Sequence, residues 1–386
     1  MKLYTKLLLA CICILLAATH LTAQQTNNYY LVIGTYTSGK SDGMYVYDFD
    51  ASAATLKYVN KVKASNPSYL AVSKNEQYVY AVNEKADSTR FTTTGSISAF
   101  AFNKKDGQLT ELNSQPSGGK HPCYVAIDQT GKWAVAANYT SGSLAILPIK
   151  ENGLLDTPIQ VIQHEGSGPD KSRQQGPHVH STIFSNDNKF LFVQDLGIDK
   201  IMLYSFDAAT GKATPAKQPF IESRPGSGPR HFEFHPSGKF AYLIEELSNT
   251  VSVLTKNKKG EFESVQIISS VPDGYKGGSA SADIHLSSDG KFLYTSNRGS
   301  SNTIGIFSVD AKSGKLKLVG HQSTMGTVPR NFVIDPTGNF LLVANQQSDN
   351  VVVLKRDTAT GLLTYTGTQI EVGNPCCLKW IKNNSH

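Results

Sequence analysis

Cysteine is scarce in this sequence, with five residues among 386. Cys11 and Cys13 lie in an apolar amino-terminal stretch, so the rest of the chain has only Cys123, Cys376 and Cys377. An odd, scattered set of thiols does not make a disulfide framework. None of them is spaced with a second cysteine or a histidine in the manner of zinc ligands. We therefore expect these three cysteines to be small buried side chains.

Charge is also sparse. Charged residues make up 18% of the chain, the formal net charge is +6, and lysines and arginines form no long run, so a nucleic-acid surface is not expected.

The sequence lacks the G-x-S-x-G, HExxH, Walker A, G-x-G-x-x-G and D-x-D-x-D-G motifs. No helical period is sustained, which excludes α/β folds. We expect no cofactor and no resident metal.

The amino terminus resembles a targeting segment. Residues 1–23 are predicted to be a secretory signal peptide, which leaves 24–386 as a single mature domain. Two lysines precede an apolar stretch at 7–18 that is too short to span a bilayer of about 30 Å. The alternative is a lipoprotein signal that ends at Cys11. No other stretch is long and apolar enough to span a membrane, so we expect a periplasmic or secreted protein.

A pattern of roughly 50 residues recurs along the chain. Each copy has an anchor residue, an apolar strand, a turn with Gly, Asn or Glu, a second strand that ends in a polar residue, and two further strands. The anchors are Pro67, Pro122, Val179, Pro229, Ser281, Pro329 and Pro375. The Gly- and Ser-rich residues 164–177 are expected to form a surface connection. Four short strands at this period predict an all-β, seven-bladed β-propeller with four antiparallel strands per blade.

The two ends of the chain together supply the seventh blade. The copy that begins at Pro375 stops after its first strand, PCCLKW. Residues 29–37, YYLVIGTYT, match a second strand and are followed by a third and a fourth. We expect PCCLKW to pair with 29–37, because closing the ring in this way removes free sheet edges.

Alignment of the blades locates a candidate site. The first two strands of a blade are antiparallel neighbours, so the start of the first and the end of the second lie at the same rim of the channel. The position after the anchor is mostly small, and His180, Arg230 and Arg330 are its exceptions. At the end of the second strand, Glu246 and Arg298 occupy a position that varies between blades. These five side chains are predicted to face one rim.

Three arginines, a histidine and a carboxylate suit an anionic, oxygen-rich small molecule. The residue before Glu246, Glu245, belongs to a nearly uniform column of polar residues, for which we expect a structural role. An alternative is that Arg230, Glu246 and Arg298 form an ion-pair network between blades and have no catalytic role.

At these residues the sequence resembles the seven-bladed lactonase family, which includes bacterial 6-phosphogluconolactonase and fungal carboxymuconate-lactonising enzyme. The similarity covers essentially the whole mature chain. It is carried by LVIGTYT (31–37), His180-Ser181, GPRHFEFHP (228–236), EEL (245–247), SADIHLSSDGKFLYTSNR (281–298) and PRNFVIDPTGNFL (329–341). The resemblance implies a carboxylic-ester hydrolase that acts on lactones, with His180, Arg230, Glu246 and Arg298 as its catalytic residues.

The predicted function is hydrolysis of a sugar-derived lactone at a rim of the central channel. Opening of the ring passes through a tetrahedral oxyanion, which Arg230 and Arg298 would stabilise. Glu246 or His180 would act as the general base on water, and the sequence leaves this choice open. The expected substrate-binding residues are Arg330, His231, Asp283 and His285.

Two other functions remain open. A lactone-forming cyclase of the carboxymuconate type could use the same residues in reverse. A non-enzymatic exported propeller could bind a ligand, since this fold hosts many unrelated functions. The predicted signal peptide bears on the substrate, because a sugar phosphate is scarce outside the cell and an unphosphorylated lactone fits export better. We infer no obligate protein partner.

Overall fold

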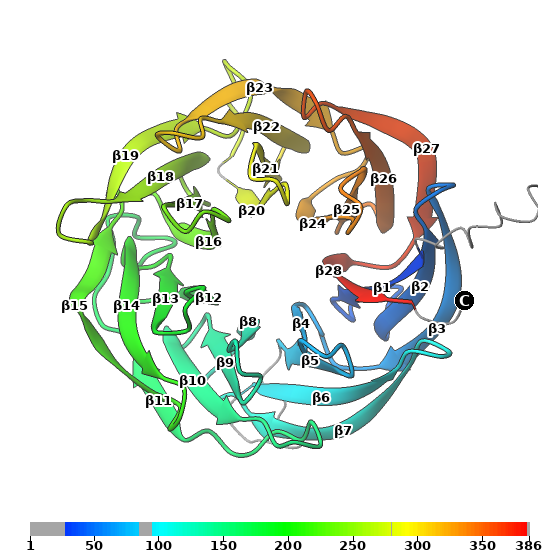
Figure 1. The fold of residues 1–386 in the computed structure, drawn as a ribbon, viewed down its shortest axis with the longest axis horizontal. Helices are drawn as coiled ribbons and strands as arrows, with labels where there is room; N and C mark the ends of the chain where they lie inside the picture. The colour runs from blue at the N-terminus through cyan, green and yellow to red at the C-terminus, as the bar shows by residue number, and fades with distance from the viewer. Residues whose placement is uncertain (1–27, 85–94, 279, 384–386) are drawn as a thin grey trace, which may run out of the picture.

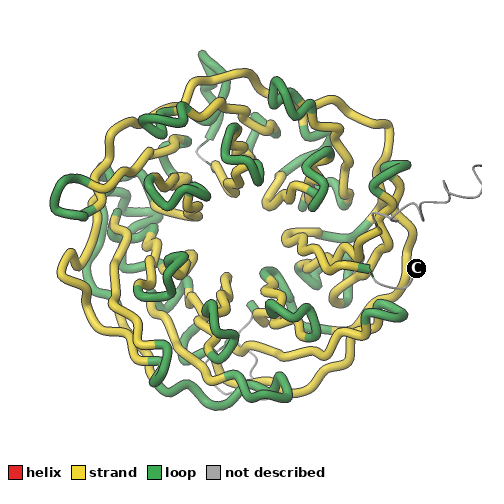
Figure 2. The backbone as a smooth tube through the Cα atoms, in the orientation of Figure 1, coloured by secondary structure: helices red, strands yellow, loops and turns green. Residues whose placement is uncertain are grey.

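The computed structural model describes residues 28–84, 95–278 and 280–383. These residues form seven antiparallel four-stranded sheets around a central channel, and Figure 1 and Figure 2 show strands and loops without a helix in the part described. The predicted seven-bladed β-propeller is confirmed. The predicted signal peptide, 1–23, lies outside the described residues. Among those described, no helix is long and apolar enough to cross a membrane.

We number the blades from the one that holds both chain ends. Blade 1 contains β28 (Pro375–Lys382), β1 (Asn28–Thr35), β2 (Gly43–Asp50) and β3 (Thr55–Lys63). Blade 2 contains β4 (Leu70–Val72), β5 (Tyr78–Asn83), β6 (Ser96–Asn103) and β7 (Gln108–Pro116), and blade 3 contains β8 (Pro122–Ile127), β9 (Trp133–Asn138), β10 (Ser143–Pro148) and β11 (Gln160–Gln163). Blade 4 contains β12 (Val179–Phe184), β13 (Phe190–Asp195), β14 (Lys200–Asp207) and β15 (Lys212–Glu222), and blade 5 contains β16 (Pro229–Phe234), β17 (Phe240–Glu245), β18 (Thr250–Lys256) and β19 (Phe262–Ser269). Blade 6 contains β20 (Ser281–Leu286), β21 (Phe292–Asn297), β22 (Thr303–Val309) and β23 (Leu316–Ser323), and blade 7 contains β24 (Pro329–Ile334), β25 (Phe340–Asn345), β26 (Asn350–Arg356) and β27 (Leu363–Glu371).

The ring closes through the chain ends, as the sequence predicts. β28 is the innermost strand of blade 1 and pairs antiparallel with β1, from Tyr29 opposite Lys382 to Gly34 opposite Cys377. The paired strand extends two residues beyond PCCLKW. Each sheet thus keeps four strands, and the first blade joins the last without a free inner edge.

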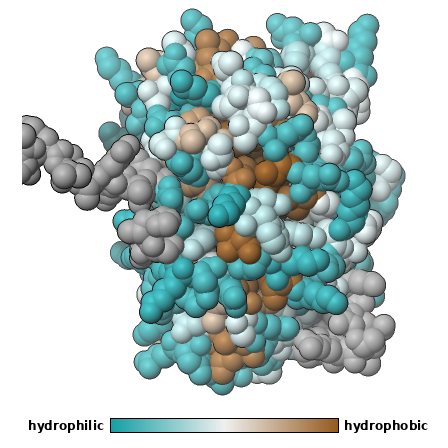
Figure 3. Space-filling view, turned by 90° about the vertical axis from the view of Figure 1, so that its right-hand side faces the viewer, coloured by the Kyte–Doolittle hydropathy of each residue, from teal (hydrophilic) through white to brown (hydrophobic). Residues whose placement is uncertain are grey.

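The outermost strand of a blade is the most exposed. All six residues of the second strand β25 are buried, whereas in the outermost strand of that blade, β27, Leu363 is buried and the other residues are partly or fully exposed. Adjacent sheets pack face to face, so the core lies between blades. Figure 3 shows the edge of the ring, where polar side chains surround smaller apolar areas. Cys123, Cys376 and Cys377 are free and buried.

The turn between the first and second strands requires a left-handed backbone. Gly131 and Gly238 adopt φ values of 74° and 69° there, and Glu76 and Asn188 take the same place with 56° and 59°. Glycine reaches this region without a Cβ penalty, and asparagine tolerates it better than most residues do. This explains the turn residues of the repeat, and the hairpin returns the second strand to the rim where the first began.

Candidate active site

A β-bulge at the start of the first strand sets the direction of the site side chains. In blade 4, the residues on either side of His180 pair with Asp195 and Gln194, so the hydrogen-bond ladder bypasses His180. The same shift bypasses Arg230 in blade 5 and Arg330 in blade 7. At a bulge, the extra residue does not follow the alternation of side chains between the two faces of the sheet, so its side chain points in a different direction. The position directly after the anchor, which holds His180, Arg230 and Arg330, is therefore the bulged position of the first strand.

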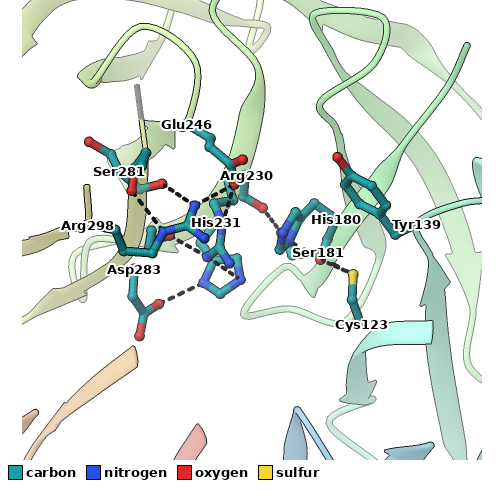
Figure 4. A network of polar contacts seen from close by, with 12 residues as sticks. Cys123, Tyr139, His180, Ser181, Arg230, His231, Glu246, Ser281, Asp283 and Arg298 are labelled. Carbon is teal, nitrogen blue, oxygen red and sulfur yellow. Dashed lines mark hydrogen bonds and ion pairs between the residues drawn. The ribbon is translucent and has the colours of Figure 1, made fainter. Parts of the chain in front are cut away.

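Glu246 directly follows β17 and lies among three arginines (Figure 4 labels two of them, Arg230 and Arg298). Its Oε2 is 2.9 Å from both Arg230 Nε and Arg298 Nη2, and its Oε1 is 2.6 Å from Arg173 Nη2. Burial alone would raise the pKa of Glu246, but the guanidinium groups of Arg298 and Arg230 hold it well below its usual range. Glu246 is a carboxylate whose two oxygens both accept from arginine.

Arg230 is only 1% exposed and is held on several sides. Its Nη1 donates to the Ala282 carbonyl at 2.6 Å and lies 3.3 Å from His231 Nε2. His231 Nδ1 is in turn 2.7 Å from Asp283 Oδ1. Burial and the charge of Arg230 lower the pKa of His231 to about 4, so the ring is neutral at pH 7. A neutral His231 that donates to Asp283 accepts from Arg230, and this chain of contacts orients the guanidinium.

His180 lies beside this chain in different surroundings. Its ring stands edge-on to His231 and Tyr139, with centroids 5.4 and 5.6 Å apart. Its Nδ1 is 4.0 Å from Cys123 Sγ, and in the described part of the chain its ring has no other hydrogen-bond partner. Burial and then the charge of Arg230 hold the pKa of His180 well below its usual range. His180 is thus a neutral imidazole with an unengaged Nε2.

A narrow pocket lies between these side chains at the centre of the ring. Its volume is about 10 Å³, close to the room that one water molecule needs. Arg330 enters from blade 7, with its guanidinium 5.2 Å from the centre of the Tyr36 ring. The lining residues are Ser68, Tyr69, Cys123, His180, Arg230, His231, Arg330, Asn331 and Cys376. A pocket of this size is too small for a sugar ring.

The loop before β12 contributes a residue that the repeat analysis missed. Residues 164–177 were expected to be a surface connection, but His164 and Gln174 are buried. His164 Nδ1 is 2.7 Å from Asp195 Oδ2, and Gln174 donates two 2.8 Å hydrogen bonds to the end of blade 4's second strand and the turn after it. These contacts hold the loop against blade 4, which places Arg173 next to Glu246. The loop that contains Arg173 has no counterpart in the other blades, so alignment of the repeats could not identify this residue.

His285 lies away from the arginine cluster. Its Nε2 is 3.2 Å from Asp283 Oδ2 and its Nδ1 is 3.6 Å from Glu233 Oε2. Burial opposes its charge, but the two carboxylates raise the pKa of His285 to about 10. Of the four expected substrate-binding residues, Arg330 and His231 therefore line the central pocket. Asp283 and His285 form a network behind His231.

The polar column that precedes Glu246 and Arg298 has the expected structural role. Asn138 Nδ2 donates to the Ser117 carbonyl at 2.8 Å, and Asn297 Nδ2 donates to the Ser270 carbonyl at 2.6 Å, so each second strand is tied to the preceding blade. Glu245 accepts from a hydroxyl within its own blade. Within the described ranges, no group of three or more His, Cys, Asp or Glu side chains is placed to hold a metal ion.

Comparison with known proteins agrees with this architecture. Residues 30–380 match the family described as "Lactonase, 7-bladed beta-propeller". The chain is 38% identical to a 6-phosphogluconolactonase of Bacillus subtilis (strain 168), over 90% of this chain and 97% of that protein. It is 39% identical to a 6-phosphogluconolactonase of Formosa agariphila, over 90% and 98% of the two chains. A periplasmic gluconolactonase of Pseudomonas aeruginosa has a solved structure with a TM-score of 0.87 and 36% identity, covering 92% of this chain and 99% of that one. The chain therefore belongs to the seven-bladed β-propeller lactonase family, and the enzyme class implied by the sequence resemblance, a lactone hydrolase similar to 6-phosphogluconolactonase, is confirmed.

Proposed function

We propose that this protein hydrolyses a sugar aldonolactone at the channel mouth. The observation that carries the proposal is the contact between Glu246 and three arginines beside a neutral histidine with a free ring nitrogen. Arginine guanidinium groups stabilise a developing oxyanion, and a neutral imidazole accepts a proton from water. A lactone ester needs both functions.

We assign the general base to His180 rather than to Glu246. Both oxygens of Glu246 accept from arginine, and its lowered pKa makes it a weak base. The pKa of His180 is lowered too, but its ring is neutral near pH 7 and its Nε2 is free to accept a proton. In this scheme His180 takes a proton from water as the oxygen attacks the lactone carbonyl. The same proton then goes to the ring oxygen as the C–O bond breaks, which gives a hydroxy acid.

Arg298 and Arg230 would stabilise the oxyanion. The Arg298 side chain is 13% exposed, against 2% for Arg230, so Arg298 is the better placed for direct contact with substrate. Its Nε donates to the Ala280 carbonyl at 2.9 Å, and Glu246 accepts from one terminal nitrogen, which together limit its movement. We assign Glu246 the role of holding these guanidinium groups in place.

The size of the central pocket supports a fixed position for the attacking water. The pocket is about as large as one water molecule and is lined by His180 and Arg230. A lactone at the mouth would meet this position from above. The more exposed guanidinium of Arg173 would contact the hydroxyl or anionic groups of the substrate.

We further propose export and an unphosphorylated substrate. The supporting observations are the predicted signal peptide at 1–23 and the similarity to a protein described as a periplasmic gluconolactonase. Sequencing the amino terminus of protein purified from the native cell tests export. A start near Gln24 agrees with the proposal, whereas retention of Met1 in a cytoplasmic product contradicts it.

The function itself is tested by assaying the purified protein with gluconolactone and with 6-phosphogluconolactone, after subtraction of spontaneous ring opening. We expect enzymatic hydrolysis, with the higher kcat/KM on the unphosphorylated lactone. A preference for the phosphorylated lactone would retain the reaction and overturn the substrate assignment. Binding of gluconate without hydrolysis of either lactone would favour a ligand-binding propeller.

A further inference from the structure

Neighbouring blades are joined by a repeated contact between an aromatic ring and a glycine. The aromatic residue stands five positions before the end of each second strand. It is Tyr30, Tyr78, Trp133, Phe190, Phe240, Phe292 or Phe340. The glycine lies in the turn between the third and fourth strands of the following blade. A Cβ atom at Gly153, Gly211, Gly314 or Gly361 would overlap the ring of the preceding blade, so these rings lie directly on the glycines.

Blade 1 has Ala54 in place of the turn glycine, so blades 7 and 1 meet without this contact. The junction between blades 4 and 5 has the glycine but not the covering ring. The glycine at this place is Gly260, and a Cβ built on it would meet no atom within 4 Å. Phe190, which should cover it, is 37% exposed, whereas its counterparts Phe240 and Phe292 are 4% and 7% exposed. Phe190 therefore leaves open the slot that the corresponding rings fill elsewhere.

A hydrogen bond joins some neighbouring blades beside this contact, and the junction between blades 4 and 5 is among those without it. In blades 2, 5 and 6, the residue two positions after the aromatic is a tyrosine. The hydroxyl groups of Tyr80, Tyr242 and Tyr294 donate to the carbonyl of the next blade's turn glycine at 3.1, 2.9 and 2.8 Å. Blade 4 has Phe192 at this position, and a phenylalanine cannot donate. Blades 1, 3 and 7 have Val32, Val135 and Leu342 there and lack this link as well.

The uncovered Gly260 lines a cavity of about 390 Å³ between blades 4 and 5, within the size range of small-molecule sites. The outer strands stay joined, because the Gln218 side chain exchanges hydrogen bonds of 2.8 and 2.9 Å with the backbone of Phe262. The cavity is thus a defined slot rather than a general separation of the blades. It opens at the rim opposite the proposed lactonase site, since β12 runs from His180 near one rim to Phe184 near the other, where it is followed by the cavity residue Ser185.

The lining of the cavity indicates the chemistry of its ligand. Phe190, Phe192, Phe234 and Phe262 supply apolar ring faces and edges. The lining contains three lysines and two acidic residues, so the cavity has a net positive charge. These residues are Lys217, Lys256, Lys259, Asp187 and Glu261. The ammonium group of Lys256 lies 5.3 Å from the centre of the Phe262 ring, so cation and aromatic surface are adjacent.

We propose that this cavity is a second binding site, which takes a small molecule with a planar aromatic body and one anionic group, such as an aromatic carboxylate or sulfonate. The ring of the ligand occupies the slot above Gly260 that an aromatic side chain fills at other junctions. The anionic group lies at the rim and pairs with Lys256 and Lys259. Burial of a flat apolar ring and a charge-assisted contact together give the affinity.

The fluorescent dye anilinonaphthalene sulfonate, an aromatic sulfonate, is the probe. Titration of the folded protein should show one saturable site, and naphthoate should displace the dye at least about tenfold better than uncharged naphthamide, as expected for one charge-assisted contact. Lys256→Met should weaken dye binding by a similar factor. Lys312→Met, an exposed lysine in the corresponding turn of blade 6, is the matched control and should change nothing.

Ala216→Trp fills the slot and should abolish binding while hydrolysis of lactone continues, because Ala216 lines this cavity and not the channel mouth. The Lys256→Met result stands even if Ala216→Trp does not fold. The proposal is overturned if the dye does not bind, or if naphthamide competes as well as naphthoate. It is also overturned if neither substitution changes the affinity, or if sedimentation shows that the cavity is covered by a second copy of the chain.

Discussion

Arg173 and Glu246 form an ion pair at the channel mouth, with 2.6 Å between Arg173 Nη2 and Glu246 Oε1, although 73 residues separate them in the chain. The Arg173 side chain is 39% exposed, whereas those of the other two arginines at Glu246 are 2% and 13% exposed. Arg173 is therefore the most exposed of the three guanidinium groups at Glu246.

We expect Arg173→Ala to raise KM about tenfold and to leave kcat within about twofold, because the lost charge-assisted contact acts on the bound substrate before and during reaction alike. Steady-state kinetics on gluconolactone measure both values. Arg224→Ala is the control, since Arg224 donates a 3.4 Å hydrogen bond to the Thr250 hydroxyl and has no contact with Glu246. A fall in kcat with unchanged KM would place Arg173 in the chemical step instead.

The pH dependence of catalysis should follow His180. Its pKa in the folded protein is below 6.5, because it is buried next to Arg230. The neutral ring, which is the form that can accept a proton, therefore remains the main form at mildly acidic pH. We expect kcat/KM to stay level as the pH is lowered through 6.5 and to fall only at lower pH. An acid limb with a midpoint at or above pH 6.5, after correction for the stability of the fold, would contradict a buried neutral His180.

His285 should give the opposite dependence in stability. Asp283 and Glu233 raise its pKa to about 10, so protonation of His285 stabilises the folded state relative to the unfolded state. This contribution is present in full below the unfolded pKa of about 6.5 and is lost as the pH rises toward 10. His285→Gln should lower the free energy of unfolding by about 1.5–3 kcal/mol at pH 6 and by much less at pH 10. Denaturant unfolding of both proteins at the two pH values tests this, and an equal difference at both would show that His285 is not charged.

Closure of the ring by the carboxy-terminal strand should be needed for stability. Leu378 in β28 is fully buried, so Leu378→Ala should cost about 2–5 kcal/mol. Lys382→Ala, at the exposed end of the same strand, should cost almost nothing. Deletion from Pro375 onward should abolish cooperative unfolding. An unchanged unfolding midpoint in the deletion variant would show that β28 does not close the ring.

The blade count and the rim residues could be predicted because they follow from a repeat. Seven anchors fix the strands, and a single register places His180, Arg230 and Glu246 at one rim. The register could not show that Arg230 and His180 sit at bulges, since a bulge is seen only in the pairing of two strands. Nor could it decide between His180 and Glu246, because their different surroundings depend on three-dimensional contacts.

Residues outside the repeat could not be placed from the sequence. Arg173 reaches the site through the buried contacts of His164 and Gln174, which join its loop to blade 4. In the sequence these residues lie in a polar, Gly-rich stretch with no periodicity. The contact of His285 with Glu233 also could not be predicted from the sequence, because Glu233 belongs to the neighbouring blade. Such contacts between blades are set by packing.

Catalysis by His180 with Glu246 as the support for the arginines predicts different kinetic effects at the two residues. His180→Ala should lower kcat about 10²–10⁴-fold with little change in melting temperature, as expected for loss of a general base. Glu246→Gln should lower the melting temperature, because buried arginines lose their counter-charge, and should reduce kcat less. Glu263→Gln, an exposed carboxylate on the outermost strand of blade 5, is the control and should have little effect.

The most direct test is therefore kcat for gluconolactone hydrolysis by His180→Ala and Glu246→Gln, measured side by side with the folded wild-type protein. The account predicts that His180→Ala has the larger loss. A larger loss for Glu246→Gln with His180→Ala near wild type would make Glu246 the base. Full activity in both variants, with only a loss of melting temperature, would show that the arginine cluster is a structural ion-pair network and that catalysis does not occur there.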